Sequence, residues 1–205
     1  MTNFIGTKNI VDAAITYGVK NFAFFSTDKA VLPINAYGYS KALAEKYIES
    51  SRGRSVNFNT YRWGNIIGSR GSVIPYFVDC ILNGVPLPLT DDRMSRFWLR
   101  IEDAASFVFD TFEQKNTEQP LIHPNIKSAT ILEVIDAIVE ITGKAATTRH
   151  INIRPGEKIH ECLKSGHDFC VRSDSCDRYS KEELKDILRD CVMERFCSSI
   201  GGSHA

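Results

Sequence analysis

The sequence lacks the features that would point to a membrane or a nucleic acid as its main partner. Its 205 residues contain no apolar run near the roughly 20 residues that cross a bilayer. Neither charge prevails, because 25 basic residues balance 25 acidic ones without a basic block. Residues Met1 to Phe4 lack the charged and then apolar pattern of a signal peptide. These absences argue against nucleic-acid and membrane partners and predict a soluble protein of the cytoplasm.

Cysteine is scarce in most of the chain. Only Cys80 lies outside the last quarter, which contains Cys162, Cys170, Cys176, Cys191 and Cys197. Their spacing includes no compact C-x-x-C pair, which disfavours a zinc site formed with His167. A disulfide scaffold is not expected in a chain that is long enough to bury an ordinary core. We therefore predict reduced thiols and no metal site.

The sequence also lacks the glycine-rich turn of a dinucleotide-binding fold. That fold opens with a strand, a G-x-G-x-x-G turn and a helix that holds the pyrophosphate of the cofactor. None of the 13 glycines forms this pattern after a predicted strand, and the segment 68–71 is too short and lies in mid-chain. The usual opening of a dinucleotide site is therefore not present in this sequence.

Short apolar segments alternate with helical ones along the chain. The run Phe22 to Phe25 is wholly apolar, which is typical of a strand that is buried on both faces of a parallel sheet. Periodicity and capping residues predict further strands at 56–61 and 97–101, and helices at 4–17, 37–50, 73–82, 102–113, 130–142 and 181–189. This alternation predicts an α/β architecture, with a smaller mixed lobe after about Leu87.

Two short segments carry an unusual set of polar side chains. Residues 26–29 read Ser-Thr-Asp-Lys at the end of a predicted strand, and residues 37–41 read Tyr-Gly-Tyr-Ser-Lys at the start of a predicted helix. Tyr37 and Lys41 are four residues apart and share a helix face. A cation beside a phenol favours the phenolate, so Tyr37 is a candidate general base for a hydroxyl. The simpler alternative is a solvated lysine beside a half-buried tyrosine.

Asp28 and Lys29 form a second candidate acid/base pair. A desolvated lysine can act as a base, and a neighbouring carboxylic acid can protonate a leaving hydroxyl. The alternative is that both are loop charges in water. Their position between Thr27 and Tyr37 favours chemistry, because ligands bind at the carboxyl ends of parallel strands.

Several blocks in a fixed order carry a resemblance to a known family. The chain resembles the extended short-chain dehydrogenase/reductase superfamily and, within it, the nucleotide-sugar 4,6-dehydratases of bacterial polysaccharide biosynthesis. The blocks are Ser-Thr-Asp-Lys-Ala at 26–30, Pro-Ile-Asn-Ala-Tyr-Gly at 33–38, the segment from Arg62 to Pro75, Ser-Arg-Phe-Trp at 95–98, Ile-Glu-Asp-Ala at 101–104 and Arg-Pro-Gly-Glu-Lys-Ile-His-Glu at 154–161. Together they cover nearly the whole chain up to about Leu188.

The resemblance implies a fold, a cofactor and a substrate. Residues 1–86 would form the C-terminal part of a Rossmann-like NAD(P)-binding domain, a partial parallel sheet with flanking helices. Residues 87–195 would form a nucleotide-sugar-binding lobe, with some exchange of segments, and residues 196–205 a flexible tail. The implied cofactor is NADP or NAD. The implied substrate is a UDP-N-acetylhexosamine, chiefly UDP-N-acetylglucosamine.

The resemblance also implies a role for each residue of the two acid/base pairs. Tyr37, assisted by Lys41, would take the proton of the sugar 4-hydroxyl while the C4 hydride passes to the nicotinamide. Lys29 would remove the C5 proton, Asp28 would protonate the 6-hydroxyl so that water leaves, and the hydride would return to C6. Thr27 would hydrogen-bond the 4-oxygen. The net reaction is a dehydration, because the cofactor is regenerated.

The remaining family positions are implied to bind the cofactor and the substrate. The cofactor residues would be Asn3, Ser26, Tyr37, Lys41 and Arg62. For the substrate, Asn65 would bind the diphosphate, and the helix start at Gly71, Ser72 and Val73 would offer its amides to an anion. Arg96 and Arg154 would bind the diphosphate or the uridine. Glu157 would accept a hydrogen bond from the ribose. A turn that opens a helix is the alternative for residues 154–161.

The sequence departs from the family pattern at its start. It begins at the helix that precedes the catalytic strand, so the glycine-rich turn and the residues that read the adenosine ribose are missing. The Phe22 to Phe25 strand would then expose a long apolar edge, which invites aggregation or pairing with another chain. A fragment, a complementing N-terminal half in a second polypeptide and a degenerate relative all fit this pattern. The superfamily also implies a homo-oligomer.

Two other functions compete with dehydration. A nucleotide-sugar 4-epimerase uses the same tyrosine and lysine, but it needs neither an elimination acid nor a C5 base, so the Asp28–Lys29 pair argues against it. A non-catalytic UDP-sugar-binding module would use Asn65, Arg96 and Arg154. Tyr37 and Lys29 would then take no part in a reaction. The reaction product separates the first alternative from dehydration, and cofactor retention separates the second.

Overall fold

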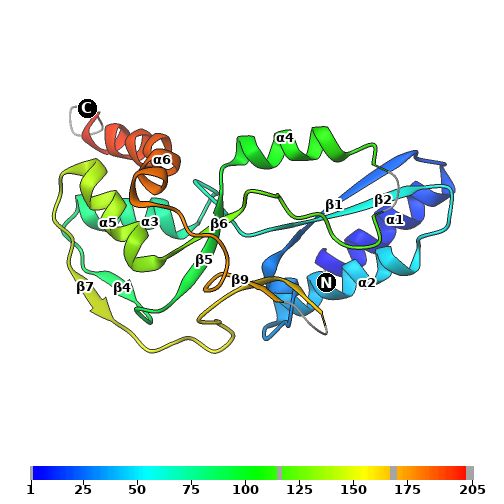
Figure 1. The fold of residues 1–205 in the computed structure, drawn as a ribbon, viewed down its shortest axis with the longest axis horizontal. Coiled ribbons are helices and arrows are strands. Elements are labelled where there is room, and N and C mark those ends of the chain that lie inside the picture. Colours follow the sequence, from blue (N-terminus) through cyan, green and yellow to red (C-terminus); the bar gives the residue numbers. More distant parts are fainter. Residues whose placement is uncertain (1, 115–116, 167–169, 202–205) are drawn as a thin grey trace. The chain divides into compact units, whose positions relative to one another are not determined.

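The computed structural model describes residues 2–114, 117–166 and 170–201 of the chain (Figure 1). The chain forms two compact units, and each combines segments that are far apart in the sequence. The first unit contains Met1–Gly64, Glu102–Ile126 and Glu161–Arg172; the second contains Asn65–Ile101, Lys127–His160 and Ser173–Ala205. The domain boundary after residue 86 stays a prediction.

The first unit is built on a pair of parallel strands. Strands β1 and β2 pair in parallel, with Phe24 opposite Thr60 and Thr27 opposite Trp63. Helices α1 and α2 bury apolar side chains against Phe24 and Phe58. The elements are a π-helical turn at Thr2–Gly6, α1 at Thr7–Thr16, β1 at Asn21–Thr27, a 3-10 helix at Asp28–Ala30, α2 at Ala36–Ser50, β2 at Asn57–Trp63, most of α4 at Ile101–Thr111, β8 at Cys162–Ser165 and β9 at Cys170–Arg172.

Strand β1 is buried on one face and partly exposed on the other. Successive side chains of a strand point to opposite faces. Phe24 is 7% exposed and lies in the core, whereas Phe25 is 52% exposed and its ring contacts the rings of Tyr61 and Trp63. The prediction of burial on both faces was therefore wrong. In the described part of the chain, β1 pairs with one strand, β2. Core side chains pack on the face of β1 that carries Phe24.

The second unit has a three-stranded mixed sheet with helices packed together beside it (Figure 1). Strand β5 pairs in parallel with β3 and antiparallel with β6. Phe77, Trp98 and Ile138 are among its fully buried or nearly fully buried side chains. The elements are β3 at Asn65–Ile66, α3 at Val73–Leu82, β4 at Leu87–Leu89, β5 at Ser95–Leu99, β6 at Lys127–Thr130, α5 at Ile131–Thr142, β7 at Thr148–His150 and α6 at Lys181–Gly201.

The last helix is longer than its sequence predicts. Ser180 opens α6 as expected, because its hydroxyl accepts from the amide of Glu183 at 3.3 Å. The helix then continues to Gly201, so the predicted end near Arg189 was wrong, whereas the flexible tail at residues 196–205 stays a prediction. Two tertiary contacts explain the extension: Val192 is buried in the core, and Arg195 binds Asp79 of α3 through two 2.7 Å hydrogen bonds. Residues 202–205 lie outside the described residues.

Helix α5 begins with a complete capping box, as the sequence predicts. The Thr130 hydroxyl accepts from the amide of Glu133 at 3.2 Å, and the Glu133 carboxylate accepts from the amide of Thr130 at 2.7 Å. Thr130→Ala removes one of these bonds, so we expect the free energy of unfolding to fall by about 1 kcal/mol. Chemical denaturation measures this. The control is Thr147→Ala at an exposed loop position, and equal losses in both variants would contradict the prediction.

Neither a membrane-spanning helix nor a metal centre is found in the described residues. No helix there is both long enough and apolar enough to cross a membrane. The same residues contain no cluster of three or more histidine, cysteine or acidic side chains that could hold a metal ion. None of the six cysteines, all of which lie in the described part of the chain, forms a disulfide bond.

Candidate active site

The end of β1 brings three of the predicted catalytic residues together. The strand ends at Thr27, and a 3-10 helix begins at Asp28. The Thr27 hydroxyl accepts from the amide of Lys29 at 3.3 Å and donates to Oδ1 of Asp28 at 3.0 Å. The Lys29 amine donates to the same Oδ1 at 3.0 Å. A carboxylate, an amine and a hydroxyl therefore form one hydrogen-bonded group.

Two polar atoms at this strand end are buried without a hydrogen-bond partner among the described residues. They are Oδ2 of Asp28, on a side chain with no exposed surface, and Oγ of Ser26, on a residue that is 5% exposed. A buried polar atom left unpaired costs about 1–3 kcal/mol, so native proteins rarely keep one without a reason. These atoms fit hydrogen bonding to a substrate or cofactor.

Helix α2 carries Tyr37 and Lys41. The helix starts at its N-cap Asn35, whose side chain accepts from the amide of Gly38 at 2.8 Å. Tyr37 is 47% exposed, while the Lys41 amine donates to the carbonyl of Phe25 at 2.6 Å. Among the described side chains, no hydrogen bond joins Tyr37 to Lys41.

The charge of Lys41 is under two opposed influences. Burial lowers the pKa of Lys41 below its usual value, and the nearby Glu45 carboxylate opposes this shift. The Lys41 ammonium also lies 4.4 Å from the ring centroid of Phe24. Burial favours the neutral amine of Lys41, whereas the Glu45 carboxylate favours its cation.

Gly38 lets α2 approach the Asp28–Lys29 turn closely. A Cβ atom at position 38 would lie 2.3 Å from the carbonyl oxygen of Lys29 and 3.1 Å from Cβ of Pro33. The first distance is too short for real atoms, and the obstacle is main chain that cannot rotate away. A glycine is therefore required where the helix of Tyr37 meets the turn of Lys29.

Gly38→Ala is expected to destabilise the protein although alanine is the better helix former. Overpacking costs about 1–3 kcal/mol, which exceeds the helix-propensity gain of roughly 1 kcal/mol. Chemical denaturation measures the change. Gly6→Ala is a matched control, because Gly6 has helical dihedral angles and no atom within 4 Å of an added Cβ. Equal stability of the two variants would refute the steric argument.

Two further cofactor candidates have partners within the first unit. The Asn3 amide donates to the Ser40 hydroxyl at 3.1 Å, and Ser40 donates to the carbonyl of Tyr37 at 2.7 Å. Arg62 of β2 makes two hydrogen bonds to the Glu45 carboxylate, at 2.9 and 2.6 Å, and a third to a β8 carbonyl at 3.0 Å. Both side chains support α2, and their contact with a cofactor stays a prediction.

The seven predicted substrate residues lie in the second unit. Asn65 begins β3, and Gly71 has a φ of +74° just before α3. Ser72 is the N-cap residue of α3, yet its hydroxyl makes no cap hydrogen bond and is buried without a partner in the described chain. Val73 is the first residue of that helix. Free amides and an unpartnered hydroxyl suit an anion at this helix start.

Arg96 is 9% exposed and braces a distant segment of the same unit. Its guanidinium donates to the carbonyls of Ser95 at 2.6 Å, Ile159 at 3.0 Å and Lys158 at 2.9 Å. These bonds hold the chain just beyond the Arg-Pro-Gly-Glu block against β5. Its role at a diphosphate stays a prediction.

The Arg-Pro-Gly-Glu block forms a turn. The Glu157 amide donates to the carbonyl of Arg154 at 3.0 Å, and the Glu157 carboxylate accepts from the amide of Arg154 at 3.3 Å. Gly156 has a φ of +86°, which favours glycine. No helix follows this turn, because the chain continues into β8, so the alternative of a helix opening here was wrong. Arg154 is exposed.

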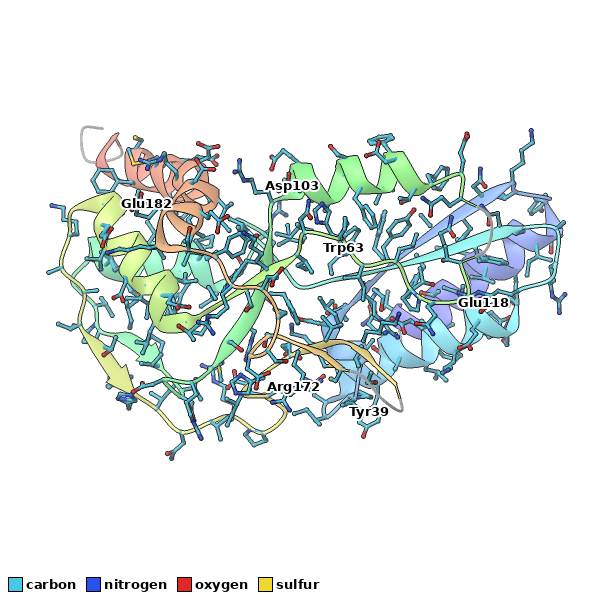
Figure 2. The ribbon with its side chains drawn as sticks, viewed as in Figure 1. Tyr39, Trp63, Asp103, Glu118, Arg172 and Glu182 are labelled. Atoms are coloured by element: carbon cyan, nitrogen blue, oxygen red, sulfur yellow. The ribbon has the colours of Figure 1, made fainter. Side chains whose placement is uncertain are left out.

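Sequence reasoning missed two acidic residues of the first unit. Glu161 is 3% exposed, and its carboxylate lies 3.8 Å from the Lys29 amine. Glu45 is 8% exposed and binds Arg62. Its spacing of four from Lys41 on one helix face was a usable signal. For Glu161 the sequence signal was weak: it is the last residue of the Arg-Pro-Gly-Glu-Lys-Ile-His-Glu block at 154–161. Figure 2 labels Tyr39 on α2 and Arg172 at the end of β9, two elements of this unit.

The chain is similar to proteins that act on nucleotide sugars. The model of the polysaccharide biosynthesis protein family matches residues 1–182. A Campylobacter jejuni protein named UDP-N-acetylglucosamine 4,6-dehydratase (inverting) is 38% identical over 174 residues, which cover 82% of this chain and 50% of that protein. A UDP-glucose 4-epimerase from Rickettsia canadensis is 37% identical over 182 residues, 87% and 53% of the two chains. This chain thus spans about half the length of these curated relatives.

Solved structures support the fold. The Pen protein from Bacillus thuringiensis has a TM-score of 0.80 at 28% identity, and the match covers 92% of this chain and 68% of the Pen chain. The dTDP-glucose 4,6-dehydratase DesIV from Streptomyces venezuelae has a TM-score of 0.79 at 20% identity, with 99% and 68% covered. The predicted α/β fold with a Rossmann-like parallel sheet is confirmed. Because the family model matches most of the chain, the protein belongs to the polysaccharide biosynthesis family of extended short-chain dehydrogenase/reductase proteins.

Proposed function

We propose that the protein carrying this chain is a nucleotide-sugar 4,6-dehydratase that converts a UDP-N-acetylhexosamine to a 4-keto-6-deoxy sugar. The Asp28–Lys29 pair carries the proposal. Lys29 binds Oδ1 of Asp28 at 3.0 Å, and Oδ2 of the same buried carboxyl has no partner among the described residues. An elimination needs both an acid for the leaving hydroxyl and a base for the C5 proton, whereas epimerisation at C4 needs neither.

Each side chain has one task in the proposed reaction. Tyr37, with the Lys41 cation nearby, takes the proton of the 4-hydroxyl, and Thr27 hydrogen-bonds the resulting oxygen. Lys29 then removes the C5 proton, which the adjacent ketone has made acidic. Asp28 delivers a proton from its free Oδ2 to the 6-hydroxyl, which leaves as water. The strand end thus supplies the acid and the base of the elimination.

The residues at the end of β1 also fit a nicotinamide cofactor. NADP or NAD, when bound, accepts a hydride and later returns it. Ser26 is one candidate for holding it, because its buried hydroxyl lacks a partner in the described part of the chain. Asn3, Lys41 and Arg62 are the others. We propose that an N-terminal half, in the same or a second polypeptide, supplies the pyrophosphate site.

The proposed UDP contacts lie in the second unit. The start of α3, at Gly71 with Ser72 and Val73, offers amides and a hydroxyl to the diphosphate. Asn65 and Arg154 are further candidates for the diphosphate or uridine, as is Arg96 if its carbonyl bonds rearrange. Glu157 would accept a hydrogen bond from the ribose. A homo-oligomer, as in the superfamily, completes the proposal.

A 4-epimerase is the second candidate, and the identity to the Rickettsia UDP-glucose 4-epimerase favours it. A UDP-sugar-binding module without turnover is the third. Both would use the same second unit. Neither of them eliminates the C5 proton and the 6-hydroxyl of the sugar, as dehydration does.

Product analysis tests the proposal. The chain is joined to the half of the Campylobacter jejuni relative that it does not match, and this joined enzyme is incubated with UDP-N-acetylglucosamine and NADP or NAD in heavy water. Dehydration predicts loss of one water from the sugar and one deuterium at C5. An unchanged mass with inverted C4 would instead establish the epimerase. Binding of UDP by calorimetry without any turnover would leave only the binding module.

A further inference from the structure

We propose that Glu161 is a positioning residue that, together with Asp28, orients the Lys29 amine. This inference rests on the proposed function only for the role of Lys29 at C5. The Lys29 nitrogen lies 3.0 Å from Oδ1 of Asp28 and 3.8 Å from Oε1 of Glu161. The aspartate side chain has no exposed surface and the glutamate side chain is 4% exposed. One lysine thus faces two buried carboxylates.

The fold holds Glu161 in this place from a distant part of the sequence. The segment Glu161–Arg172 belongs to the first compact unit, although most of its sequence neighbours belong to the second. Arg62 donates to the carbonyl of Leu163 at 3.0 Å and also binds Glu45 of α2 through two hydrogen bonds. Strand β8 is therefore tied to both β2 and α2, and Glu161 immediately precedes that strand.

Two hydrogen-bond acceptors are enough to orient the lone pair of a neutral lysine amine. A neutral amine has two N–H bonds and one lone pair. If Asp28 and Glu161 each accept one N–H, the lone pair points away from both carboxylates. The 3.8 Å separation is an ion-pair distance, and catalytic hydrogen bonds commonly shorten only when the substrate binds. A single acceptor at Asp28 would leave the amine free to rotate, and the lone pair would lose its alignment with the C5 proton.

The inference predicts opposite effects on two measurements in Glu161→Gln. The uncharged glutamine amide accepts a hydrogen bond more weakly than a carboxylate, so the Lys29 amine is held less firmly and an amine-reactive reagent should modify it several-fold faster, as peptide mass spectrometry measures. Loss of orientation should slow deuterium incorporation at C5 and kcat by about tenfold in the joined enzyme, with little change in KM. Glu161→Asp keeps the charge and should stay close to wild type in Lys29 labelling.

A matched control and a second measurement separate positioning from a merely structural role. Glu118→Gln changes an exposed acid of the same unit and should alter neither measurement (Figure 2). Unfolding raises the labelling of all lysines together, whereas the proposal raises Lys29 alone. The inference is overturned if Glu161→Gln labels Lys29 no faster than Glu118→Gln, or if C5 exchange is unchanged while labelling rises. Labelling uses the chain by itself, so it decides the Glu161–Lys29 contact even if no dehydration is observed.

Discussion

Tyr37→Phe is expected to lower turnover of the UDP-sugar in the joined enzyme by about 10²- to 10⁴-fold, the usual contribution of a positioned general base. The substitution removes only the phenolic oxygen, and Tyr37 is 47% exposed, so the fold should tolerate it. Deuterium incorporation at C5 should fall with turnover, because the C5 proton becomes acidic only after C4 is oxidised. Steady-state kinetics and mass spectrometry measure both quantities.

The control for this prediction lies two residues further along α2. Tyr39 is 61% exposed, and Tyr39→Phe removes the same atom from the same helix without a proposed role in chemistry. It should therefore leave turnover near that of the wild type. UDP binding by calorimetry should be unchanged in both variants, because the proposed UDP residues lie in the second unit. Comparable turnover in the two variants would remove Tyr37 from the mechanism.

Arg62→Met is expected to reduce the free energy of unfolding by about 3–5 kcal/mol, because it leaves a buried carboxylate without its cation. The side chains of Arg62 and Glu45 are 16% and 9% exposed, and two hydrogen bonds of 2.9 and 2.6 Å join them. The third bond, to the carbonyl of Leu163, would also be lost. Chemical denaturation of the chain measures the loss.

A double variant shows whether the loss comes from the unpaired charge. Replacing a buried ion pair by apolar side chains of similar volume is often neutral. Arg62→Met with Glu45→Met should therefore recover much of the stability that Arg62→Met loses. Lys46→Met is the control for an exposed pair, since the side chains of Lys46 and Glu49 are 75% and 52% exposed, and it should stay close to wild type. The argument fails if the double variant is less stable than Arg62→Met.

Local features of the site were predictable because they depend on neighbouring residues. The Thr27, Asp28 and Lys29 group is continuous in sequence at a strand end, and the structure joins it by hydrogen bonds. The start of α5 was equally readable, because a threonine and a glutamate three residues apart cap each other. In both cases the interacting atoms are within one turn of chain.

Features that depend on distant contacts were not predictable. The prediction for Phe25 failed because exposure depends on what covers the outer face of β1, which an apolar run does not state. The end of α6 was misplaced because Arg195, beyond the predicted end near Arg189, binds Asp79 of α3. Local composition does not encode this tertiary ion pair.

The sequence by itself determined which residues carry the proposed chemistry, because the proposed acid, base and tyrosine stand in short ordered blocks. Only the tertiary structure decided how those groups are supported. It places the Glu161 carboxylate 3.8 Å from the Lys29 amine and pairs Glu45 with Arg62. It also requires glycine at position 38, where a Cβ atom would meet the carbonyl oxygen of Lys29. Such contacts join residues far apart in the chain, and their energies depend on burial, which no local pattern encodes.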